Sequence, residues 1–314
     1  MSFQMNASPS PDNPGLINWL LILILGVIWG AAFMSIRVAL DGFSPAQVAA
    51  GRIGIGALAL WLLGHLVGQP LALITKVAGR RGWAFVVIIG AGSIAVPLSL
   101  LSWGQQYVPS AFAGVAMGTV PLLVLPLVFA FSPDEGIGPR RVIGMLMGFA
   151  GLVIMIGPGA FDASYGALSI WGGLACIASA GCYAVGSILT RRAPKMPPVA
   201  LASGTLIVAA VIVVPLALII DELPREFPMR PSAALLYAAL FPTALAAIIR
   251  VRVITTAGSL FMSLTSYMVP VWSVIFGIAL LAEELPAQLY LALALILGGI
   301  FIAQSRQIFA RLRG

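Results

Sequence analysis

The sequence is poor in charged residues and in side chains that bind metals. Of its 314 residues 9% are charged, whereas soluble domains carry roughly 25%. The two cysteines, Cys176 and Cys182, lie six residues apart in one apolar segment. That spacing does not bring helical neighbours together, so we expect no disulfide between them. His65 is the only histidine and lies near the end of a segment, so we expect neither a metal nor another cofactor.

What the sequence does contain is apolar. Hydrophobic residues make up 61% of the chain, and the mean hydropathy is +1.07. Runs of about 20 apolar residues can cross a hydrocarbon core roughly 30 Å thick as helices. The pattern predicts an all-α integral membrane protein with ten transmembrane helices, over residues 16–37, 45–67, 82–104, 110–131, 138–158, 168–190, 199–220, 232–249, 258–281 and 286–305. The loops are short, and no phosphate-binding GxxxxGKS/T pattern occurs, which excludes nucleotide-driven pumping within this chain.

The positive residues indicate how the helices are oriented. With the N-terminus in the cytoplasm, 13 lysines and arginines fall on the cytoplasmic side and three, Arg37, Arg225 and Arg230, on the other. This bias predicts a multi-pass protein of the cell inner membrane with both termini in the cytoplasm. The net charge of +7 therefore fits membrane orientation, and we expect no nucleic acid partner. Residues 1–15 are predicted to form a flexible polar tail, and residues 306–314 a basic cytoplasmic tail.

One pattern occurs twice in the chain. In residues 119–136 a Val-Pro pair is followed 13 residues later by two adjacent acids, and residues 268–285 repeat this 149 residues further on. The repeated stretches fall in the fourth and ninth predicted helices, which cross the membrane in opposite directions. The pattern therefore indicates an inverted repeat of two five-helix halves, residues 16–158 and 168–305, an architecture common among secondary transporters.

Several stretches resemble a known family. They are WGAAFMSIRVAL, AAGRIGIGAL, QQYVPSAFAGVAMGTVPLL and SYMVPVWSVIFGIALLAEELP. They are similar to the drug/metabolite transporter superfamily, EamA type. The resemblance implies ten helices in two inverted halves and a central cavity lined mainly by the first four helices of each half. Members move amino acids, other metabolites or toxic compounds, often outward. The first half departs from the family pattern, since FSPDEGI stands where an LLGE-like string is usual.

Three classes of function compete. A secondary transporter, which the resemblance implies to be an exporter, would bind a small-molecule substrate within the lipid bilayer. A membrane-embedded lipid-modifying enzyme is the alternative, but it would need clustered acids, histidines or cysteines inside the helices. A channel or receptor is the third, without a charged ring or ligand-binding domain to support it. We therefore expect a transporter and not an enzyme, as a monomer or a homodimer.

Polar side chains within the apolar runs are the candidate cavity residues. Ser263 and Ser266, with Ser259, share one helical face, as do Ser99, Ser102 and Gln106. These hydroxyls either line a cavity or fold back onto carbonyl groups one turn away. Aromatic side chains could form apolar walls with polar tips or lie in interfacial belts. They are Trp29, Phe33, Trp103, Tyr183 and Tyr267.

Arg52 is the remaining candidate, because it lies seven residues into the second predicted helix. A charge at that depth is costly unless something offsets it. Two roles stay open: a structural one, with the guanidinium reaching outward or onto free carbonyl groups, and direct contact with an anionic substrate.

The acids and glycines have simpler interpretations. All ten acids lie in loops, tails or helix ends, so we expect them to end or cap helices, and we expect facilitated diffusion or exchange instead of proton antiport. The glycine pairs Gly114 with Gly118 and Gly144 with Gly148 predict close helix packing.

Overall fold

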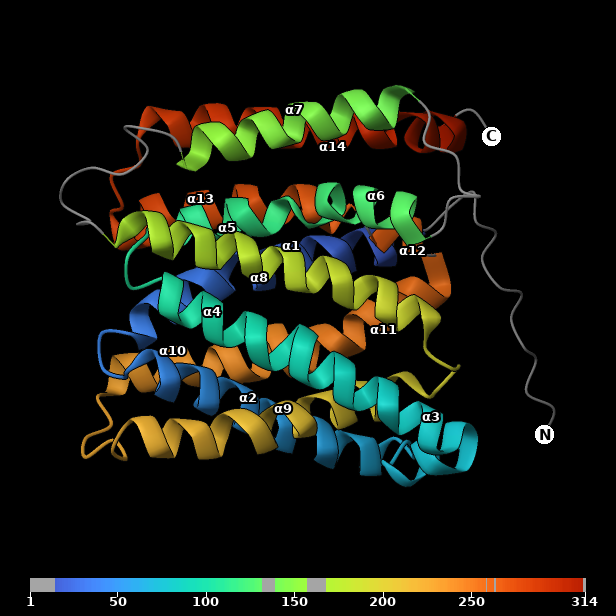
Figure 1. Ribbon diagram of the computed structural model, residues 1–314, viewed down its shortest axis with the longest axis vertical. Coiled ribbons are helices and arrows are strands. Elements are labelled where there is room, and N and C mark those ends of the chain that lie inside the picture. Colours follow the sequence, from blue (N-terminus) through green and yellow to red (C-terminus); the bar gives the residue numbers. More distant parts are fainter. Residues whose placement is uncertain (1–14, 132–138, 157–167, 258, 263, 313–314) are drawn as a thin grey trace.

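The computed structural model describes residues 15–131, 139–156, 168–257, 259–262 and 264–312, and these are helical apart from short connections (Figure 1). The elements up to the middle of the chain are α1 (Gly15–Ala39), α2 (Pro45–Leu66), α3 (Ala72–Gly90), the π-helical turn η1 (Ala91–Ala95), α4 (Val96–Gly104), α5 (Ser110–Gly118), α6 (Val120–Phe131) and α7 (Pro139–Ile156). Those that follow are α8 (Ser169–Arg192), α9 (Pro198–Ile220), α10 (Met229–Ala239), the π-helical turn η3 (Leu240–Leu245), α11 (Ala246–Ala257), α12 (Ser259–Met262), α13 (Thr265–Leu281) and α14 (Ala287–Leu312).

The helices have the length and composition of membrane spans. Within the described residues, six are long and apolar enough to cross a bilayer, and four shorter apolar helices accompany them. Large apolar side chains cover the outside of the bundle, among them Ile219 at 81% exposed and Val153 at 70%. An outer surface of this kind is suited to lipid and not to water. The protein is therefore a multi-pass helical membrane protein.

Local sequence explains where the helices begin and end. Ser44 caps α2: its Oγ accepts a hydrogen bond from the backbone N–H of Gln47, whose side chain accepts one from the N–H of Ser44 in return. At the other end of the fold, α13 stops because Ala282 adopts a left-handed conformation with φ of 52°. Because the helices end at such caps and stops, the connections between successive spans are short, and the spans lie adjacent and antiparallel.

Several of the predicted boundaries are wrong, and the third and fourth helices show this most clearly. The third helix was expected to begin at residue 82, but α3 begins at Ala72 and is interrupted at Gly79, which has φ of 55° and ψ of −146°. Only glycine adopts this conformation readily, so the chain can turn here between a short surface segment and the buried helix. The fourth expected helix is likewise two pieces, since α5 ends at Gly118 and α6 begins at Val120.

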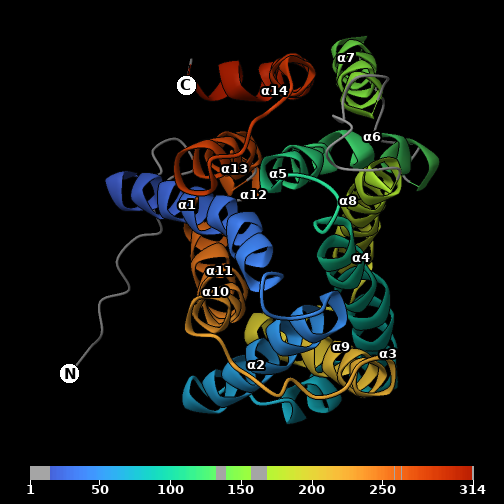
Figure 2. The same cartoon turned by 90° about the vertical axis from the view of Figure 1, so that its left-hand side faces the viewer.

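The strongest packing between the two predicted halves occurs in corresponding places. The most extensive helix contacts join α7 to α14 and α2 to α9, and further extensive contacts join α13 to α1 and to α5. Figures 1 and 2 show α7 and α14 at one extreme of the molecule and α2 and α9 at the other. The first and last described helix ends, Gly15 and Leu312, lie at the same end of the bundle (Figure 1).

The predicted glycine contacts are confirmed. Gly144 lies against the backbone of Gly299, and Gly148 lies against the side chain of Leu122. On α5, Gly114 faces Ser273, and Gly118 faces the ring of Pro270. At each position an added Cβ would overlap its neighbour, so the absence of a side chain sets the distance between the helices.

Candidate solute site

Arg52 lies inside the bundle with its charge uncompensated by any described acid. It is in α2 and only 8% exposed, and its Nε has no hydrogen-bond partner in the part of the chain that the structure describes. The described acids all lie outside the helices, in connections such as those holding Asp41 and Glu283. An isolated buried cation is expensive, which makes this position a candidate for function.

Tyr183 of α8 lies close to the part of α2 that carries Arg52. It packs against a cluster that includes Ala49 and Ile53, which are three residues before and one residue after Arg52 along α2. Part of its side chain nevertheless remains accessible. A neutral phenol can donate or accept a hydrogen bond, but it does not neutralise the guanidinium. The structure thus brings together two predicted site residues that are 131 positions apart and come from different predicted halves.

Ser93 adds a second polar group without a partner beside α8. Its Oγ is buried, has no hydrogen-bond partner among the described residues, and lies against Gly186. Gly186 is three residues from Tyr183, so the two face the same side of α8 about one turn apart. Ser93 belongs to η1, and π-helical turns are frequent at functional sites. Sequence reasoning missed Ser93 because nothing in the apolar run marks the turn.

The two π-helical regions are each held by the first helix of the other half. The indole Nε1 of Trp29 in α1 donates a hydrogen bond of 3.1 Å to the carbonyl oxygen of Pro242 in η3. The Oγ of Ser179 in α8 donates one of 2.9 Å to the carbonyl oxygen of Pro97, which follows η1. Irregular turns free backbone carbonyl groups, and these side chains satisfy two of them. Trp29 is half-buried, and its hydrogen bond ties α1 to the π-helical turn η3.

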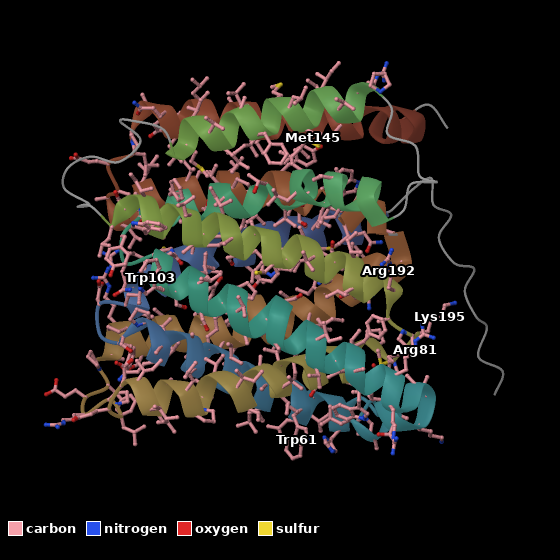
Figure 3. The ribbon with its side chains drawn as sticks, in the orientation of Figure 1. Trp61, Arg81, Trp103, Met145, Arg192 and Lys195 are labelled. Carbon is pink, nitrogen blue, oxygen red and sulfur yellow. The ribbon has the colours of Figure 1, made fainter. Side chains whose placement is uncertain are left out.

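Three predicted residues line a separate cavity at one end of the bundle. Ser99, Trp103 and Gln106 border a space of about 390 Å³ between α4, the start of α2 and the end of α9. Figure 3 shows Trp103 at the end of the bundle opposite Arg81, Arg192 and Lys195. Trp103 is 37% exposed and makes an edge contact with Tyr107 at 5.1 Å. Ser102 does not join them, because its Oγ is buried and donates to the carbonyl of Leu98 in its own helix.

The remaining predicted residues are dispersed. Phe33 is 6% exposed and packs in the core between α1 and α5. Ser266 and Tyr267 lie half-buried on α13, and Tyr267 packs against the same core. Ser263 lies outside the described residues, so the expected hydroxyl face of this helix has no structural account.

Gln105 is a polar residue that sequence reasoning passed over in favour of its neighbour. It is fully buried, and its Nε2 donates a hydrogen bond of 2.9 Å to the carbonyl oxygen of Phe33, while its Oε1 has no partner among the described residues. Gln106 is exposed, and its Nε2 donates to the carbonyl of Trp103, one turn back. The helix ends at Gly104, so the helical period used to select Gln106 does not extend to it.

A larger cavity of about 770 Å³ opens at the same end as Trp103 and carries charge of both signs. Its lining includes Arg37, Asp41, Arg230 and Glu283. Arg37 and Asp41 form an ion pair at 3.5 Å. Glu283 accepts hydrogen bonds from the backbone N–H groups of Ser110 at 2.7 Å and Ala111 at 3.1 Å. The capping role expected for these acids is confirmed for Glu283, whereas Asp134 and Glu135 lie outside the described residues.

The sequence model of the EamA-like transporter family matches this chain twice, over residues 16–157 and 170–304. The chain belongs to the EamA-like transporter family. The resemblance seen in the sequence alone is thereby confirmed. Each match covers one of the two predicted halves.

Curated relatives of this EamA-like protein are similar over nearly their whole length. The uncharacterized inner membrane transporter YedA of Escherichia coli (strain K12) is 27% identical over 291 residues, which cover 90% of this chain and 88% of the relative. A probable terminal-alkyne amino-acid exporter of Streptantibioticus cattleyicolor is 25% identical over 302 residues, covering 93% and 95%. The uncharacterized transporter YoaV of Bacillus subtilis (strain 168) is 23% identical over 283 residues, covering 90% and 94%.

A solved crystal structure shares the fold. It superposes with a TM-score of 0.65, covering 96% of this chain and 99% of its own, at 24% sequence identity. At this identity the likeness concerns the arrangement of the helices alone. The family match and the transporter relatives support a transporter-type membrane protein.

Proposed function

We propose that this protein is a secondary transporter that exports small organic metabolites, such as amino acids, across the cell inner membrane by alternating access. The observation that carries the proposal is the double match of the family model, with one copy on each half of the chain. One relative is named a probable amino-acid exporter, which supports this substrate class. The site would lie between the halves, near Arg52 and Tyr183, with Ser99, Trp103 and Gln106 along the route.

The proposed architecture is ten membrane-crossing helices in two inverted halves. Its support is the matched pairing of α7 with α14 and of α2 with α9, and the presence of a π-helical turn in the third span of each half. The hydrogen bonds from Trp29 to Pro242 and from Ser179 to Pro97 connect the first span of one half to the third span of the other. Alternating access would be a rocking of the halves about these contacts.

The proposed energy coupling is facilitated diffusion or exchange. Proton-coupled carriers commonly use acids placed inside their helices. Every described acid lies in a connection between helices. Uphill movement driven by an imposed pH gradient and abolished by Asp41→Asn would contradict this coupling.

Counterflow in sealed vesicles tests the proposed transport. We expect vesicles that contain the purified full chain, loaded with unlabelled amino acids, to take up at least one labelled amino acid with saturable kinetics. Protein-free vesicles are the control, and the solute recovered from inside should be chemically unchanged. Absence of saturable uptake across amino acids, organic acids and amines would contradict transport. A chemically altered solute would favour the membrane enzyme instead.

Reporter fusions test the proposed topology. We expect fusions after Gly79 and after Gly314 to report the cytoplasm, and a fusion after Ala163 to report the opposite side. The reason is the distribution of positive residues: Arg81, Arg192 and Lys195 lie at the end of the bundle where α1 begins and α14 ends (Figure 3). An external signal after Gly314 would require an odd number of spans and would eliminate the inverted repeat.

A further inference from the structure

Arg52 is a buried cation within the bundle, and part of its hydrogen-bonding capacity is unused among the described residues. Arg52 lies about 10 Å along α2 from Pro45, at a rise of about 1.5 Å per residue. It is 8% exposed, and its Nε has no partner among the described residues. Its neighbour Tyr183, on α8, carries a neutral phenol. No described acid lies within the helices to offset the charge, because the described acids are all in the connections between helices.

The geometry of the guanidinium N–H groups determines which ligands can bind to Arg52. A guanidinium forms its strongest contacts as a fork of two parallel N–H groups, and the side-on fork consists of Nε together with one terminal nitrogen. In Arg52 the buried Nε lacks a partner among the described residues. The planar ligand with two acceptor oxygens that matches this fork is a carboxylate. The Tyr183 hydroxyl, on the neighbouring helix α8, is a further donor.

We propose that Arg52 binds the carboxylate group of the transported solute, with Tyr183 donating to the same group, so that the substrates are small carboxylates. This inference rests on the proposed transport function and specifies its substrate class. Binding neutralises the buried charge and so offsets the cost of holding a cation in the membrane. Arg52 and Tyr183 come from α2 and α8, so the carboxylate would bridge the two halves of the chain.

The wild-type protein provides the first test. The probes are L-amino acids and the matching L-amino acid amides, which keep the side chain and amine but lack the carboxylate. We expect each amide to inhibit counterflow of the corresponding labelled amino acid at least about tenfold less strongly, because it cannot form the charge-assisted pair. Equal inhibition by the amide and the acid would overturn the proposal, and this comparison requires no variant to fold.

Variants of Arg52 provide the second test. Arg52→Gln should raise KM for amino acids about tenfold or more and leave inhibition by the amides unchanged. Arg52→Lys should be intermediate, since it keeps the charge and loses the fork. Tyr183→Phe should raise KM by a smaller factor. The matched control is Arg225→Gln, because Arg225 is exposed and pairs with Glu222 at 2.7 Å; it should leave KM unchanged.

The outcomes separate this inference from the function on which it rests. An unchanged KM for amino acids in Arg52→Gln overturns the carboxylate contact, as does exchange restricted to solutes without an anionic group, and in both cases transport itself stands. Absence of any saturable exchange removes the proposed function and this inference together. Thermal unfolding in detergent distinguishes a loss of binding from a loss of folded protein.

Discussion

Gly114→Val should prevent most of the protein from reaching its folded state. Gly114 lies in α5 directly against the side chain of Ser273 in α13, and a Cβ at this position would overlap both the Oγ and the Cβ of that serine. Ser273 is 1% exposed and its Oγ donates to the carbonyl of Pro270, so it has no free space into which to move. Overpacking of a core costs about 1–3 kcal/mol, and here two helix backbones would have to separate.

The measurement is the amount of monodisperse protein extracted from membranes, with the midpoint of thermal unfolding in detergent for whatever is recovered. Gly181→Val in α8 is the matched control, because nothing lies within 4 Å of a Cβ added at Gly181. Ser273→Gly should restore part of the stability of a milder Gly114→Ala variant, since it removes the overlapping atoms. Equal losses at positions 114 and 181 would show that helix propensity, not the contact between α5 and α13, decides the result.

The helices could be predicted from the sequence because each apolar run is bounded by prolines, glycines or charges. For example, DGFSP contains the turn before α2, and α9 begins at Pro198. The early start of α3 at Ala72 could not be predicted from the sequence, because the segment up to Gly79 contains Lys76 and Thr75 and does not resemble a span. The π-helical turns were also missed, since their composition matches that of the helices around them.

The site residues were harder to predict for a physical reason. In a soluble helix, the polar face points to water and the apolar face to the core, so the period of the sequence reveals the inner side. Here both the lipid and the core are apolar, and that distinction is lost. Serines chosen by spacing therefore had different outcomes: Ser99 borders a cavity, whereas Ser102 bonds within its own helix. The proximity of Arg52 and Tyr183 depends on how α2 packs against helices that are distant in the sequence. No local sequence pattern predicts this packing.

Glu283 should prove to be the acid on which the junction between α13 and α5 depends. Its carboxylate accepts hydrogen bonds from the backbone N–H groups of Ser110 and Ala111, which have no partner within α5 because they belong to its first turn. The acid follows α13 in the second half of the chain, while α5 is in the first, so this cap joins the halves. A carboxylate at a helix N-terminus also interacts favourably with the helix dipole.

Glu283→Ala should therefore lower the free energy of unfolding by about 1–2 kcal/mol, the usual cost of losing an N-cap. Glu284→Ala is the matched control: it removes the same charge one residue later, from an exposed side chain, and should change stability by no more than about 0.5 kcal/mol. Denaturant unfolding of both variants in the same detergent gives the comparison. If both substitutions cost the same, the effect comes from the charge at this end of the bundle, and the hydrogen bonds to Ser110 and Ala111 contribute nothing of their own.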